Sequence, residues 1–168
     1  MAGRRRSPAN DAPRVLDAKA ARLAAADLLS RHAWTQVELT RRLVRRGAPA
    51  DVAAAVVTDL VARGHVDDAA FARHFVDTRA ARGYGAAWLS AGLRARGVSP
   101  ALIASALTEL DTAAQLDHAR AVARRRLPAL RKVSPERAAA RVRDQLLRRG
   151  FPSSVVMRVL REVPRVND

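Results

Sequence analysis

The stretch AGLRARGVSPALIASALTEL, residues 91–110, decides the fold. Leu93 stands four residues before its central Gly97, Leu89 stands four residues earlier still, and apolar residues follow the glycine at helical spacing. Apolar residues three to five positions apart form one face of a helix, and a glycine after such a face commonly ends the helix in the left-handed conformation. The stretch therefore predicts two amphipathic helices joined by a tight turn at Gly97.

The same pattern occurs twice more in the chain. The strings RRLVRRGAPADVAAAVVTDL (41–60) and RDQLLRRGFPSSVVMRVLREV (143–163) align with the first on Gly47 and Gly150. Five apolar columns are shared, at eight and four residues before the glycine and at five, ten and thirteen after it. In that order the columns are Leu39, Leu89, Val142; Leu43, Leu93, Leu146; Val52, Leu102, Val155; Val57, Leu107, Leu160; and Leu60, Leu110, Val163. The threefold pattern predicts a tandem repeat protein.

A third helix is expected before each pair, since successive turn glycines are 50 and 53 residues apart. These helices are predicted at roughly 16–30, 68–82 and 112–127. Polar residues at the predicted helix starts fit N-terminal caps: Thr35 with Glu38 as a capping box, Asp67 with Asp68, Ser99 and Ser134. No segment alternates with period two. We expect an all-α chain of three tandem three-helix bundles, elongated and arched, with repeats at 15–66, 67–110 and 111–168 after a disordered basic tail, 1–14.

The charge of the chain predicts a polyanionic partner. Its formal net charge is +15, and residues 111–168 alone carry 14 basic and 6 acidic side chains. A field of one sign attracts nucleic acid or an acidic protein surface. A GC-rich genome explains arginine in place of lysine, but it does not explain the excess of 31 basic over 16 acidic residues.

The stretch RGHVDDAAFARHF (63–75) raises the question of a metal or acid–base site, because two carboxylates stand between His65 and His74. Asp67 fits a helix N-cap and Asp68 the first turn, where the helix dipole favours an anion. His74 lies off the face of Asp68, and functional constellations need mutual geometry. The chain has no cysteine, phosphate loop or nucleophile elbow. We expect no enzyme activity, metal or cofactor, and a reducing cytoplasm as the setting.

The segment GHVDDAAFARHFVDTRAARGYGAAWLSAGLRARGVSPALIASAL (64–107) resembles the central repeat of the bacterial RecX regulatory proteins. The shared features are Asp-Asp followed by Phe-Ala, a glycine-rich link, leucines at helical spacing and an Arg-Gly-Val turn. ADLLSRHAWTQVELTRRLVRRG (26–47) resembles their first repeat. The resemblance implies a protein of DNA recombination, repair and the SOS response, which binds RecA and its filament on single-stranded DNA and inhibits ATP hydrolysis and strand exchange.

Basic side chains are the candidate contacts to RecA or to DNA phosphates. They are Arg41, Arg45, Arg94, Arg96, Arg124, Arg125, Arg126, Arg131, Lys132, Arg148 and Arg149. The residue before each turn glycine is an arginine, so that column has an alternative structural role at a helix C-terminus. A direct, sequence-nonspecific DNA-binding module and an α-solenoid adaptor remain alternatives. We expect a monomer without a membrane segment, since no long heptad pattern or uncharged span is present.

Overall fold

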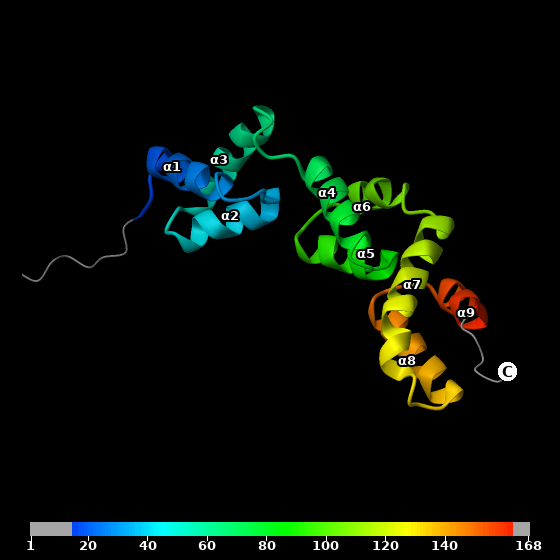
Figure 1. Ribbon diagram of the computed structural model, residues 1–168. Coiled ribbons are helices and arrows are strands. Elements are labelled where there is room, and N and C mark those ends of the chain that lie inside the picture. Colours follow the sequence, from blue (N-terminus) through cyan, green and yellow to red (C-terminus); the bar gives the residue numbers. More distant parts are fainter. Residues whose placement is uncertain (1–14, 163–168) are drawn as a thin grey trace, which may run out of the picture. The chain divides into compact units, whose positions relative to one another are not determined.

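The computed structural model describes residues 15–162, and the predicted tail at 1–14 lies outside this part. The described residues form nine α-helices and a short 3₁₀ turn, without a strand (Figure 1). The helices are α1 (Ala18–Leu29), α2 (Gln36–Arg45), α3 (Ala50–Ala62), α4 (Asp68–Ala80), α5 (Ala86–Ala95), α6 (Pro100–Leu107), α7 (Thr112–Arg126), α8 (Pro135–Arg148) and α9 (Ser153–Glu162), with the 3₁₀ turn at Leu127–Leu130. The predicted all-α fold of three three-helix units is confirmed.

Helices α1–α3, α4–α6 and α7–α9 are called repeats 1, 2 and 3, and each has a hydrophobic core of its own. The chain forms two compact units, and most contacts of each unit are among its own residues. Unit 1 ends at Val66 and contains repeat 1, whereas unit 2 begins at Asp67 and contains repeats 2 and 3. The two units are described separately below.

The first helix of each pair buries the predicted columns. All six side chains at eight and four residues before the turn glycine are at most 1% exposed. They are Leu39, Leu89, Val142, Leu43, Leu93 and Leu146.

The predicted columns of the second helix are buried or packed against the core at every described position, and Val163 lies outside the described residues. The most deeply buried positions lie beside these columns. Positions one, six and nine after the glycine are buried in all three repeats, while the column at plus five is buried only at Val155. Alanine occupies several of these positions, and its small side chain gives a weak periodic signal. The buried residues are Ala48, Val98, Phe151; Ala53, Ile103, Val156; and Val56, Ala106, Val159.

Each turn between the paired helices is a Schellman motif. The three glycines have φ of 99°, 79° and 81°. In repeat 1, the Gly47 N–H donates to the Val44 carbonyl at 2.9 Å and the Ala48 N–H to the Leu43 carbonyl at 3.0 Å. The equivalent bonds occur at Gly97 and Gly150. In this motif the residue after the glycine packs on the residue four positions before the glycine. This contact places the two helices around one core.

The caps at the helix starts follow the sequence in most cases. Thr35 is fully buried and its hydroxyl accepts from the Glu38 N–H at 3.2 Å. Asp67 accepts from two N–H groups of α4 at 2.8 and 2.9 Å, and Ser99 accepts from Leu102 at 3.4 Å. Ser134 stands at the N-cap of α8, as predicted, although its hydroxyl makes no capping hydrogen bond. Pro135 follows it at N1, where proline removes one donor and presets the helical φ.

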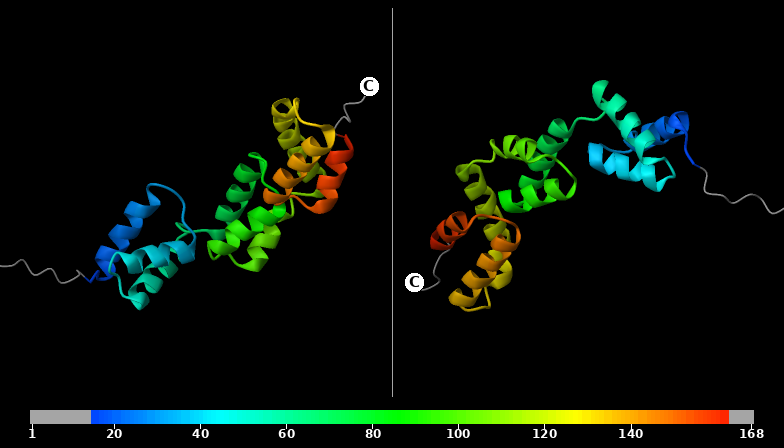
Figure 2. Two further views of the ribbon diagram at one scale, coloured as in Figure 1. Left: turned by 90° about the horizontal axis from the view of Figure 1, so that it is seen from below. Right: turned by 180° about the vertical axis from the view of Figure 1, so that it is seen from behind.

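Repeats 2 and 3 lie side by side (Figure 2), and hydrogen bonds to backbone atoms join them. The Gly85 N–H donates to the Arg149 carbonyl at 2.8 Å, and the Ala87 N–H donates to the Gly150 carbonyl at 3.1 Å. Between them, the Ala86 N–H donates to the side-chain oxygen of Gln115 at 3.3 Å. The turn of repeat 3 thereby supplies acceptors to the free N-terminal donors of α5.

Candidate interaction surface

Nine of the eleven candidate contacts are exposed and form no ion pair with a carboxylate in residues 15–162. These nine are Arg41, Arg45, Arg94, Arg124, Arg125, Arg126, Arg131, Lys132 and Arg148. Among the bonds between described residues, only Arg94 of these nine has a side-chain hydrogen bond, to the Ser90 hydroxyl at 2.8 Å. The first two lie on α2 of unit 1 and the other seven lie in unit 2. Each unit therefore presents basic side chains that can attract a polyanionic partner.

The arginines before the turn glycines make contacts within the protein. In repeat 1, the Arg46 guanidinium pairs with Asp27 of α1 at 3.2 Å and lies 3.4 Å from the Ala24 carbonyl. Arg31 pairs with the same carboxylate at 2.8 Å. Hydrogen bonds from Arg31, and then from Arg46, lower the pKa of Asp27 below its ordinary value. Arg46 therefore ties α2 to α1.

Arg96 and Arg149, which are candidate contacts, occupy the same column and are half-buried. Arg96 donates to the Gly92 carbonyl at 2.8 Å and lies over the Phe75 ring at 5.0 Å. Arg149 reaches from repeat 3 to repeat 2, where it donates to the carbonyls of Arg82 at 2.9 Å and Gly83 at 3.1 Å. Both side chains have structural partners, in accord with the structural alternative for this column.

Four aromatic rings of repeat 2 form one row. Phe71 and Phe75 have centroids 6.3 Å apart, Phe75 and Trp88 are 6.1 Å apart, and Trp88 and Tyr84 are 4.0 Å apart. The Arg149 guanidinium lies 5.2 Å from the Tyr84 centroid. The ring faces are thus used in packing with each other and with guanidinium groups.

A pocket of about 130 Å³ in unit 2 brings four arginines together. Its lining consists of Arg82, Val122, Arg125, Arg126, Gln145 and Arg149. Sequence analysis missed Arg82 and Gln145 as members of a site. No spacing signal marks them, because Arg82 and Arg149 are 67 residues apart and meet only where repeat 3 packs on repeat 2.

The stretch 63–75, with its histidines and aspartates, contains the start of helix α4. Asp68 is buried in the first turn of α4, and His65 and His74 are exposed. Within residues 15–162 no group of three or more His, Cys, Asp or Glu side chains is placed to hold a metal ion. In the same part of the chain, every helix is too short or too polar to cross a bilayer.

The fold and these exposed arginines define a class: tandem helical-repeat proteins with basic surfaces. Family models for the first, second and third three-helix domains of RecX match residues 21–60, 67–107 and 113–160. The chain belongs to the RecX family of regulatory proteins.

Curated relatives and solved structures agree with this assignment. The regulatory protein RecX of Thermobifida fusca is 39% identical over 136 residues, which cover 80% of this chain and 74% of the relative. That of Mycobacterium avium is 36% identical over 135 residues, which cover 79% and 78%. The crystal structure of RecX from Lactobacillus salivarius superposes with a TM-score of 0.79 at 18% identity, over 87% of this chain and 96% of that one. The structural likeness shows the fold.

Proposed function

We propose that this protein binds the RecA recombinase and the RecA filament on single-stranded DNA, and inhibits ATP hydrolysis and strand exchange. The observation that carries the proposal is membership of a regulatory family across all three three-helix domains. The chemistry of the surface supports it, because guanidinium groups that form no ion pair among the described residues suit carboxylates and phosphates as bidentate partners.

The exposed arginines of both units are the proposed contacts. Arg41 and Arg45 lie one turn apart on α2, and Arg124 to Arg126 end α7. About a third of the candidates should matter individually, since a minority of interface residues carries most of the binding energy. We propose that the protein acts as a monomer in the cytoplasm, a reducing compartment that suits a chain without cysteine.

Direct DNA binding without sequence preference is the second candidate. The helices that would enter a major groove, α3 and α6, expose mainly small side chains, such as Ala54, Ala55, Ala101 and Ala104. These side chains cannot make the bidentate contacts that read bases. The exposed Arg124–Arg126 cluster supports phosphate contacts, whose affinity should fall with salt at a log–log slope of roughly −0.7 per neutralised phosphate on single strands.

The first test is single-strand-dependent ATP hydrolysis by the cognate RecA, with this protein titrated from well below to above the RecA concentration. We expect inhibition at substoichiometric amounts, because one regulator bound to a filament affects many protomers. Circular dichroism controls for folding, and DNA in excess controls for competition for the strand. Undiminished hydrolysis at excess protein would contradict the proposal and favour the DNA-binding alternative.

A triple variant with Arg124, Arg125 and Arg126 changed to Ala distinguishes the two candidates. If direct DNA binding accounts for the effect, this variant should lose single-strand affinity together with inhibition. If RecA contacts elsewhere on the surface dominate, inhibition should persist while DNA affinity falls.

A further inference from the structure

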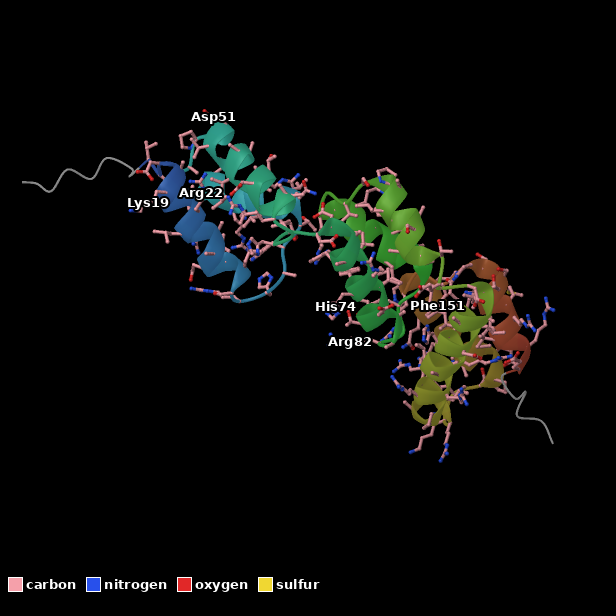
Figure 3. The ribbon with its side chains drawn as sticks, turned by 90° about the horizontal axis from the view of Figure 1, so that it is seen from above. Lys19, Arg22, Asp51, His74, Arg82 and Phe151 are labelled. Atoms are coloured by element: carbon pink, nitrogen blue, oxygen red, sulfur yellow. The ribbon has the colours of Figure 1, made fainter. Side chains whose placement is uncertain are left out.

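The basic pocket of unit 2 is built from both repeats of the unit. Arg82 follows α4 of repeat 2 (Figure 3), whereas Val122, Arg125 and Arg126 lie on α7, and Gln145 lies on α8. Arg149, which follows α8, completes the lining. The site thus exists only where the two repeats pack together.

The arginines of this pocket form no ion pair with any carboxylate in the part of the chain that the structure describes. The side chains of Arg82, Arg125 and Arg126 make no hydrogen bond or ion pair within residues 15–162. Three carboxylates of repeat 3 are engaged by arginines outside the pocket. Asp117 and Glu162 pair with Arg120, at 2.9 and 2.6 Å, and Asp144 pairs with Arg143 at 3.1 Å.

One guanidinium of the pocket is held in place. The Nη1 of Arg149 donates to the Arg82 and Gly83 carbonyls, and its guanidinium carbon lies 5.2 Å from the Tyr84 centroid. A group fixed in this way loses little side-chain entropy when it binds a ligand. The polar amide of Gln145 adds a further donor to the lining.

The ligand chemistry follows from the number of donors. A carboxylate has two oxygens and satisfies one guanidinium fork, whereas a phosphate offers more acceptor oxygens and up to two negative charges. A volume of about 130 Å³ is room for one such oxyanion. We propose that this pocket binds a phosphate group, either of a nucleic-acid backbone or of a free phosphate compound, and that the bound phosphate links repeat 3 to repeat 2.

An occupied pocket has a measurable consequence that does not involve RecA. A ligand that binds only the folded state stabilises it in proportion to the logarithm of its concentration over its Kd. Because the phosphate contacts both repeats, unit 2 should unfold at a higher temperature when phosphate is present.

The test is thermal unfolding of the full chain in the Trp34→Phe background, so that Trp88 fluorescence reports unit 2. Sodium phosphate, pyrophosphate and a short oligothymidine are each compared with sodium chloride at equal ionic strength. We expect the melting temperature of unit 2 to rise by about 10–20 °C when the ligand is at about 100 times its Kd. An Arg125→Gln, Arg126→Gln double variant should lose most of this rise.

The matched control is an Arg124→Gln, Arg131→Gln double variant, which loses the same charge at exposed positions outside the pocket lining. It should keep the rise. No rise over chloride with any phosphate compound, or an equal rise in both double variants, would overturn the proposal, since the effect would then be absent or due to screening of net charge. A pocket-dependent rise with oligothymidine alone identifies a nucleic-acid phosphate, and a pocket-dependent rise with phosphate or pyrophosphate identifies a free phosphate compound.

Discussion

Arg149 shows how one side chain connects two repeats. It donates two hydrogen bonds to carbonyls that follow α4 and lies over the Tyr84 ring. Its neighbour Arg148 is exposed and makes no side-chain contact of this kind within the described residues. Two adjacent arginines of the same turn therefore have different roles, one within the fold and one on the surface.

We expect Arg149→Ala to lower the unfolding free energy of unit 2 by about 2 kcal/mol, because hydrogen bonds from charged groups contribute about 1.5–3 kcal/mol. Arg148→Ala should change it by no more than about 0.5 kcal/mol, as is usual for surface positions. Urea unfolding followed by Trp88 fluorescence, with Trp34 replaced by Phe, measures both. Equal losses at the two positions would show that the Arg149 contacts contribute little.

The turns between paired helices depend on glycine for two separate reasons. All three turn glycines have positive φ, which costs about 1–2 kcal/mol for other residues. Gly150 has a second restriction, because a Cβ there would collide with the backbone of Trp88 in repeat 2. Gly64, after α3, has a φ of 73°, and a Cβ added there would meet no other atom within 4 Å.

Gly150→Ala should therefore cost more than Gly64→Ala. We expect about 1 kcal/mol at Gly64 from backbone strain alone, and at least about 3 kcal/mol at Gly150, where strain and collision add. Urea unfolding gives the two values, followed by Trp88 fluorescence for Gly150→Ala and by Trp34 fluorescence for Gly64→Ala. A loss at Gly150 no greater than that at Gly64 would mean that repeat 3 shifts freely away from repeat 2.

Helices and turns could be predicted from the sequence where they depend on residues only a few positions apart. The turn glycines and the leucines before them indicated the helix pairs, since capping and amphipathic periodicity act within a few residues. The buried face of each second helix was predicted only in part, because Ala53 and Ala106 occupy core positions with weakly apolar side chains. The basic pocket was not predictable, because its residues meet only through packing of one repeat on another.

At the scale of the molecule, the two compact units predict how the chain can be divided. Unit 2 contains both repeats of the backbone junction, so a fragment of residues 67–168 should fold cooperatively by itself. A fragment of residues 67–110 should melt at a much lower temperature. It loses the hydrogen bonds to Arg149 and Gly150 at the N-terminus of α5 and the contacts of the Arg149 side chain, and it exposes to water the surface that repeat 3 covers.

Circular dichroism melts of the two fragments, beside the full chain, test this division. A fragment 67–110 as stable as 67–168 would show that repeat 2 does not need repeat 3. Failure of 67–168 itself to fold would contradict its description as a compact unit.

The hydrogen bonds between repeats 2 and 3 have a consequence for protein engineering. Two of them join backbone to backbone, at Gly85 and Ala87, and every residue except proline can provide such a donor. The surface of repeat 3 can therefore be redesigned, with its exposed arginines exchanged for acids or aromatics, while Arg149 and these backbone bonds keep the coupling between repeats. A designer who retains the glycines at 83, 85 and 150 has a reusable joint onto which repeats with other binding surfaces can be grafted.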